Sequence, residues 1–85
     1  MNIVLTEEAD KNYRKLPARL QTKTDKQFLH LLNNRRHPSL RTKKMTGGDC
    51  FEGRIDYHYR FTFIISAETI FILSIGPHDE GLGKK

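Results

Sequence analysis

The stretch that decides the fold runs from residue 51 to residue 79 and reads FEGRIDYHYRFTFIISAETIFILSIGPHD. Apolar side chains alternate with others over 51–55 and again over 59–65, which is typical of strands that bury one face. The run over 70–75 is almost continuously apolar and favours a central strand covered on both faces. Short connections join the three segments, so the sequence predicts antiparallel strands here.

Four side chains suited to phosphate chemistry converge on these strands. Alternation puts Glu52 and Arg54 on the side opposite the apolar residues of the first strand. Arg60 stands between Tyr59 and Phe61, so it leaves the apolar face of the second strand. His78 follows directly on the last strand. A carboxylate, two guanidinium groups and an imidazole can therefore meet on one exposed sheet face, where they could bind and cleave a phosphodiester.

The N-terminal half predicts one short strand and two helices. Residues 2–5 read as the strand, and Thr6 is a good N-cap for a helix that opens with two glutamates. Pro17 stops this helix and can equally sit in the first turn of the next one. The second helix ends at Asn33, Asn34 and Pro38. The two helices are therefore expected to form an antiparallel hairpin.

The predicted fold class is α+β, in a single domain over residues 1–85. Residues 40–45 are expected to be extended, and 46–49 read as a turn. The helical hairpin should cover one face of a small antiparallel sheet and leave the other face open. Glu52, Arg54 and Arg60 are expected to point to that open face. Ile64 shares their side, so the open face is not expected to be wholly polar.

The chain is basic, with 15 Lys and Arg against 10 Asp and Glu, a net charge of +5 and a pI near 9.6. A basic surface on so small a domain favours nucleic acid or an acidic protein as partner. The alternative is that the lysines only keep the surface soluble. Arginines stand in the strands as well as in the helices, which favours the nucleic-acid interpretation.

Composition also bears on the redox environment, membrane association and metal binding expected of the protein. The single cysteine, Cys50, excludes an internal disulfide framework and fits a reducing cytoplasm. We interpret it as a small apolar residue rather than a nucleophile. No signal-peptide pattern and no segment of membrane-spanning length is present, so a soluble cytoplasmic protein with no membrane partner is expected. Histidines and cysteine lack metal-ligand spacing, so neither a metal site nor another cofactor is expected.

Three short motifs follow one another at a spacing found in a known family. They are FEGRI at 51–55, YRFTF at 59–63 and IGPHD at 75–79. With the acidic start of the first helix and Lys-Leu-Pro at 15–17, they resemble the RelE/ParE toxins of bacterial toxin–antitoxin systems. Each motif is weak alone, but their order and spacing together are more specific, and the resemblance covers nearly the whole chain.

The resemblance implies a function as well as a fold. The family fold is a small antiparallel sheet with a helical hairpin on one side. Its implied activity is that of a ribosome-dependent endoribonuclease that cuts messenger RNA and is held inactive by a cognate antitoxin. Arg60 matches the arginine of the family's Tyr-Arg motif, which contacts the scissile phosphate. Arg54 matches a basic position in the preceding strand, and His78 a basic or histidine position after the last strand.

RNA cleavage without a metal requires a base for the 2′-hydroxyl, cations for the phosphoryl transition state and an acid for the leaving 5′-oxygen. We assign Glu52 as the base and His78 as the acid, because a histidine pKa is normally near neutrality. Arg54 and Arg60 form the phosphate clamp, since a planar guanidinium meets two phosphate oxygens at once. The residues expected to contact nucleic acid are Lys43, Lys44, Arg54 and Arg60.

Other interpretations remain open. Arg60 could simply pair with Glu52 across the sheet, and His78 could hydrogen-bond Asp79 at the strand end. Many nuclease members of the family carry a tyrosine near the C-terminus, whereas no tyrosine follows Tyr59 here. A ParE-like inhibitor of DNA gyrase, acting by protein binding, is therefore an alternative, as is an inactive relative kept as a regulatory partner. The Tyr-Arg motif and His78 favour the nuclease.

Overall fold

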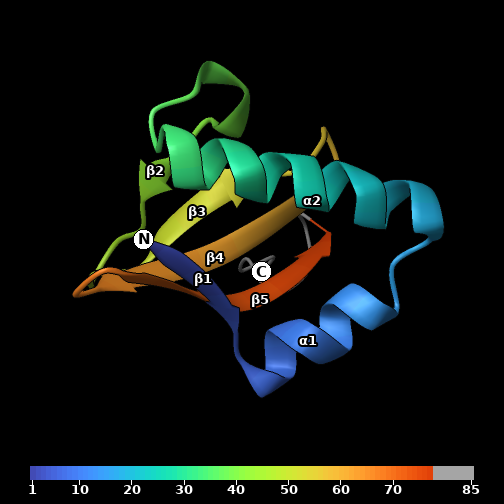
Figure 1. The fold of residues 1–85 in the computed structure, drawn as a ribbon, viewed down its shortest axis with the longest axis horizontal. Coiled ribbons are helices and arrows are strands. Elements are labelled where there is room, and N and C mark those ends of the chain that lie inside the picture. Colours follow the sequence, from blue (N-terminus) through green and yellow to red (C-terminus); the bar gives the residue numbers. More distant parts are fainter. Residues whose placement is uncertain (78–85) are drawn as a thin grey trace.

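The chain folds into two α-helices and a five-stranded sheet, which confirms the expected α+β class. The computed structural model describes residues 1–77, so His78 and the residues after it lie outside the described part. In chain order the elements are β1 (Asn2–Leu5), α1 (Glu7–Arg14), α2 (Ala18–Asn33), the short 3₁₀ helix η1 (Pro38–Leu40), β2 (Lys43–Lys44), β3 (Phe51–Arg54), β4 (Tyr59–Ser66) and β5 (Thr69–Pro77) (Figure 1).

The sheet has the order β1-β5-β4-β3-β2, and it is antiparallel except at one edge. There β1 runs parallel to β5, with Asn2 opposite Thr69 and Leu5 opposite Ile72. The expectation of a wholly antiparallel sheet was therefore wrong for this strand. Short turns force consecutive strands to be antiparallel, but β1 reaches β5 through the rest of the chain, and no turn dictates its direction.

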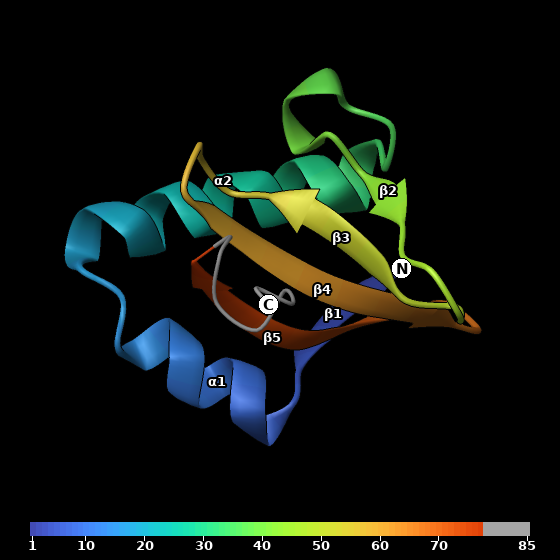
Figure 2. The same ribbon diagram turned by 180° about the vertical axis from the view of Figure 1, so that it is seen from behind.

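Helix α2 covers one face of the sheet, as both ribbon views show (Figures 1 and 2). Its residues Leu20, Phe28 and Leu31 are buried in the core. The ring of Phe28 meets that of Phe61 on β4 edge-on, with centroids 5.2 Å apart. Gln27 is also buried, and its Nε2 donates 2.8 Å to the carbonyl of Arg54 at the end of β3. Aromatic packing and this hydrogen bond together fix α2 on the sheet.

Helix α1 packs alongside β5, where β1 no longer pairs with it. Thr6 caps α1 by accepting from the Ala9 amide, and its hydroxyl donates 3.1 Å to the Leu73 carbonyl. Asn12 Oδ1 accepts from the Ile75 amide at 2.9 Å. The edge of β5 would otherwise leave these backbone groups without partners. The helix thus takes over from β1 as the neighbour of β5.

Pro17 separates α1 from α2, as expected. Hydrogen bonds also link the two helices to each other. The Tyr13 hydroxyl donates 2.8 Å to Asp25, and Gln21 Nε2 donates 3.0 Å to the Tyr13 carbonyl. The hydrogen bond to Asp25, followed by burial and the negative charge of Asp25, raises the pKa of Tyr13 above its ordinary value.

The segment between α2 and β3 is less extended than the sequence pattern indicated. Residues Pro38–Leu40 form η1, whose start is capped by His37 Nδ1 accepting from the Ser39 amide at 3.2 Å. Arg41 then turns the chain with a φ of 45°, so only Lys43–Lys44 pair as a strand. The cap and the turn interrupt the extended run expected over 40–45.

A β-bulge explains how β5 buries its apolar run. Thr62 pairs with Ser74 but Phe63 pairs with Ile72, so Leu73 is an extra residue on β5. The bulge shifts the alternation by one position. As a result Ile72 shares the core face with Ile75, although the two are an odd number of residues apart.

Gly53 on β3 lies directly beneath the ring of Phe61, its cross-strand neighbour on β4. A Cβ at position 53 would overlap the ring atoms Cζ and Cε1 of Phe61. Phe61 is 1% exposed and contacts Phe28 and Phe63, so its ring has no free space to move into. Only glycine allows this approach of β3 to the core.

Gly53→Ala should therefore lower the free energy of unfolding by about 1–3 kcal/mol, because the added methyl overpacks the core. The matched control is Gly48→Ala, since a Cβ at Gly48 meets nothing within 4 Å. Urea denaturation of both variants measures the difference. Equal stabilities for the two variants would contradict the packing argument.

Candidate active site

Two rows of polar side chains cross the sheet on the face opposite α2. Residues paired across antiparallel strands project to the same side. The register places Lys43, Glu52, Thr62 and Ser74 in one row over β2, β3, β4 and β5. The second row places Arg54 on β3 opposite Arg60 on β4. The structure therefore brings four of the expected residues, Lys43, Glu52, Arg54 and Arg60, to one face.

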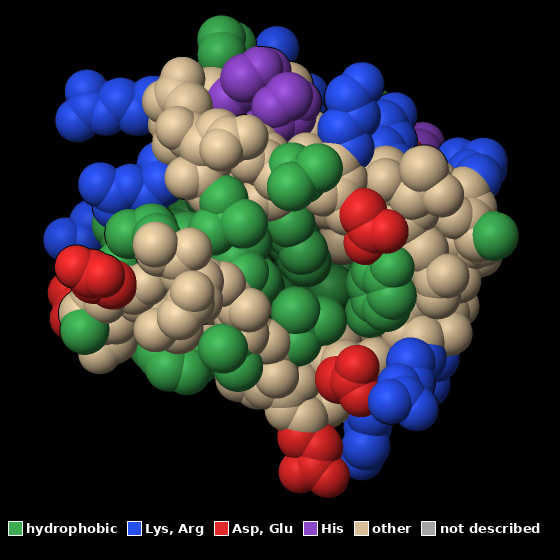
Figure 3. All heavy atoms as spheres, viewed as in Figure 1, with side chains coloured by type: hydrophobic (Ala, Val, Ile, Leu, Met, Phe, Trp, Pro, Cys, Tyr) green, Lys and Arg blue, Asp and Glu red, His purple; other side chains and the backbone are tan. Residues whose placement is uncertain are grey.

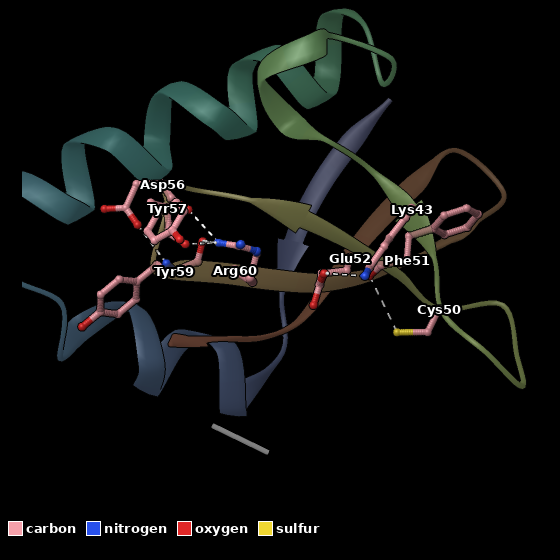
Figure 4. A network of polar contacts seen from close by, with 8 residues as sticks. All are labelled: Lys43, Cys50, Phe51, Glu52, Asp56, Tyr57, Tyr59 and Arg60. Carbon is pink, nitrogen blue, oxygen red and sulfur yellow. Dashed lines mark hydrogen bonds and ion pairs between the residues drawn. The ribbon is translucent and has the colours of Figure 1, made fainter. Parts of the chain in front are cut away.

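Glu52 is the buried acid of this face. It is only 6% exposed, and among residues 1–77 its ion-pair partner is Lys43, whose Nζ lies 3.8 Å from Glu52 Oε1. The lysine side chain itself is 68% exposed. A buried carboxylate needs such a partner to offset its loss of hydration. The expected alternative of a Glu52–Arg60 pair is replaced by this pair within the described residues (Figure 4).

Beside Glu52, Thr62 and Ser74 continue the row as a hydroxyl pair, with their oxygens 2.7 Å apart. Either hydroxyl can donate, so the pair can also offer a donor to a ligand. Alternation from Arg60 could have identified Thr62 in the sequence. Its partner Ser74 depends on the strand register, which the sequence does not reveal.

Among the described residues, Arg60 is oriented by carbonyl groups at the β3–β4 connection and not by an acidic side chain. Its Nη1 donates to the carbonyls of Asp56, Tyr57 and Tyr59 at 2.7, 2.8 and 3.2 Å. Figure 4 shows the guanidinium turned toward this loop. Within residues 1–77, neither Nε nor Nη2 of Arg60 has a hydrogen-bond acceptor, so both keep their donors for a ligand.

Asp56 shapes the loop that holds Arg60. Its Oδ1 accepts from the amides of His58 and Tyr59 at 2.9 and 2.8 Å. This turn directs the loop carbonyls toward the guanidinium. Asp56 was not among the expected site residues, although its place before a strand is a common position for a turn-forming aspartate.

Glu52 and Arg60 line one cavity of about 330 Å³. It extends from the hydroxyl pair to α1, which contributes Glu8 and Asn12. Its full lining is Glu8, Asn12, Met45, Glu52, Arg60, Thr62, Ser74, Ile75, Gly76 and Pro77. Sequence spacing gave no sign that α1 would reach this face. The cavity presents two carboxylates, one guanidinium and two hydroxyls to a group bound there.

The remaining expected residues have different positions. Arg54 is half-buried, and its Nε is buried without a hydrogen-bond partner among the described residues. Lys44 pairs with Phe51 and so projects to the opposite face from Lys43. The structure does not bring Lys44 to the rows. His78 follows Pro77, which lines the cavity, but His78 itself lies outside the described residues.

Metal binding and membrane crossing can also be judged for residues 1–77. No three or more His, Cys, Asp or Glu side chains are grouped there as a metal ion would require. Neither helix in that part of the chain has the length and apolar character that a membrane crossing needs.

Comparison with known proteins gives a fold match. No family model and no curated protein sequence matches the chain. The YoeB/ParE toxin from Agrobacterium tumefaciens matches with a TM-score of 0.80 and 16% identity, covering 92% of this chain and 99% of that one. YafQ from E. coli gives 0.78 and 10%, covering 95% and 97%. The E. coli RelBE toxin–antitoxin complex gives 0.71 and 23%, covering 87% and 92%. The RelE/ParE-like fold is thus confirmed.

Asp56→Ala should lower the free energy of unfolding by about 1 kcal/mol, because two loop amides lose their acceptor. Asp56→Asn removes the same charge but keeps a side-chain oxygen, so it should stay close to the parent protein. Chemical denaturation and amide exchange at Tyr59 measure both. If the two variants behave alike, the loop is held by something other than the Asp56 oxygen.

Proposed function

We propose that this chain is the toxin of a toxin–antitoxin module and that it cleaves messenger RNA on the ribosome. The observation that carries the proposal is the shared face of Glu52, Arg54 and Arg60, with Glu52 and Arg60 lining one cavity. The fold supports it, because several solved structures that match are toxins, some of them in complex with antitoxins.

The proposed chemistry is acid–base cleavage by side chains. Glu52 accepts the 2′-hydroxyl proton, and the oxygen then attacks the phosphorus. Arg54 and Arg60 stabilise the additional negative charge of the transition state. His78 protonates the leaving 5′-oxygen, which yields a 2′,3′-cyclic phosphate. Lys43 balances the charge of Glu52 and can contact a neighbouring phosphate.

The exposed face of the helices supports a protein partner. Apolar side chains gather in the hollow between α1 and α2 (Figure 3). On α2, Leu29 is 60% exposed, and on β1, Val4 is 44% exposed. A partner that lies on the helical side or on the open sheet face would cover such surface, and an acidic antitoxin would also offset part of the +5 charge.

One observation favours a second candidate, a ParE-like inhibitor of DNA gyrase that acts by binding. Arg60 is tied to three carbonyls, and Glu52 is nearly inaccessible and paired with Lys43. Both residues therefore have structural roles that need no substrate. The nuclease remains our proposal, because Arg60, with two nitrogens that have no acceptor within residues 1–77, lines the same cavity as the hydroxyl pair.

Induction of this chain alone should arrest growth and cut messenger RNA during translation. Primer extension on transcripts from arrested cells would locate the cuts, and a translation initiation inhibitor should abolish them. Intact transcripts beside gyrase-linked DNA breaks would refute the nuclease and support the second candidate.

Arg60→Ala should reduce cleavage about a hundredfold, since loss of one transition-state cation costs about 3 kcal/mol. Because Arg60 also holds the β3–β4 loop, Asp56→Ala is the control: it disturbs the same loop but keeps the guanidinium. We expect the cleavage rate of Asp56→Ala to fall by less than about tenfold. In vitro cleavage on programmed ribosomes measures both. Equal losses would assign Arg60 to the loop rather than to the chemistry.

A further inference from the structure

A second cavity lies on the other side of the sheet and has a different chemistry. Its volume is about 520 Å³, within the range of small-ligand and peptide-anchor pockets. The lining residues are Arg35, Arg36, His37, Pro38, Arg41, Thr42, Phe51, Phe63 and Ile65. We name it the arginine cavity. It lies between the segment that follows α2 and the ends of β3 and β4.

The register separates this cavity from the candidate active site. Phe51 pairs with Phe63, and both alternate with the row that carries Glu52 and Thr62. They therefore project to the face that α2 covers. Lys44 pairs with Phe51 and projects to this same side. In Figure 3, Lys and Arg side chains gather over this region, around β2 and the adjoining end of α2.

The charge of the arginine cavity is not compensated within the described chain. Its lining contains three arginines and neither aspartate nor glutamate. The ion pairs within residues 1–77 are Arg14–Asp10 and Lys43–Glu52, so Arg35, Arg36 and Arg41 have no acidic partner there. The three arginines are exposed and line one cavity, so an anionic ligand placed there would offset their positive charge.

The backbone around the cavity is also held in an unusual conformation. Arg41 has a φ of 45° and a ψ of 46°, the left-handed region that glycine adopts easily and arginine does not. His37 fixes the preceding turn through the Ser39 amide, and its ring stacks on His30 with centroids 3.8 Å apart. The pKa of His30 is lowered by burial, then by His37 and Lys26, which favours the neutral form of His30. The backbone segment that carries Arg41 therefore already has a defined conformation without a ligand.

The floor of the cavity is apolar. The rings of Phe51 and Phe63 are stacked, with centroids 5.4 Å apart, and Ile65 lies in the same lining. An aliphatic or aromatic side chain would bury apolar surface there, and no polar group would lose hydrogen bonds to water. A nucleobase would bring ring nitrogens and exocyclic groups against carbon atoms and leave some of them without hydrogen bonds.

We propose that the arginine cavity docks an acidic peptide segment of a protein partner, with one large apolar side chain on the floor formed by Phe51 and Phe63. The flanking carboxylates pair with Arg35, Arg36 and Arg41 at the rim. This arrangement joins recognition of acidic motifs by clustered arginines to an apolar anchor. The inference goes beyond RNA cleavage and does not rest on it, because it concerns the opposite face of the sheet.

The test uses the full chain and a fluorescein-labelled peptide of sequence Asp-Glu-Leu-Phe-Glu-Asp. Fluorescence anisotropy should detect binding, and a peptide with serines in place of leucine and phenylalanine should bind more weakly. Arg35→Gln and Arg41→Gly should each lower the affinity for the first peptide by about twofold to fivefold, as expected for partly exposed ion pairs. Arg41→Gly should melt at the same or a higher temperature, because glycine accepts the positive φ.

Arg19→Gln is the matched control, since Arg19 is exposed in the first turn of α2 and does not line the cavity. It should change binding little. Equal weakening by Arg19→Gln, or equal binding of the two peptides, would overturn the proposal. A hexauridylate RNA that binds with the same dependence on Arg35 and Arg41, while neither peptide binds, would also overturn it and assign the cavity to nucleic acid.

Discussion

The contact between the Phe61 ring and Gly53 is the constraint on which the rest of the structure depends. It brings β3 and β4 together in a single register, because only one position of β3 lacks the Cβ that the ring would strike. The same ring meets Phe28 and so fixes α2 over the sheet. A slip of one residue would move Glu52 into the core and Phe51 to the surface. The polar rows therefore exist because an aromatic ring and a glycine fit on the opposite side.

Much of this fold could be predicted from the sequence, and the exceptions have physical causes. The cap at Thr6, the break at Pro17 and the alternation along β3 and β4 are local signals, and the elements they predicted are confirmed. The parallel pairing of β1 with β5 is not local, since no turn joins these strands. The bulge at Leu73 is equally hidden, because a continuous apolar run has no alternation that could reveal a shift.

The candidate site was predictable only as far as alternation reaches. Alternation assigned Glu52, Arg54 and Arg60 to one face, and the register confirms that placement. It could not reveal which group each side chain meets, since Arg60 turns to loop carbonyls that Asp56 positions. The functional roles of these residues stay predictions. The arginine cavity was not predicted, because it forms where α2 and η1 meet the ends of β3 and β4. Residue spacing within one element does not indicate which other elements it will contact.

The pairing of β1 with β5 has a consequence for how the protein is made. The hydrogen bond from Thr6 to the Leu73 carbonyl joins residues 67 positions apart. Translation delivers β1 before β5, so the first strand waits without its partner until the intervening residues 6–68 and β5 itself have been made. Closing so long a loop also slows folding. Ser74, Ile75 and Gly76 of the candidate cavity belong to that last strand. A nascent copy therefore cannot complete this cavity before β5 has been synthesised, so the cavity belongs only to the folded chain and not to its N-terminal part.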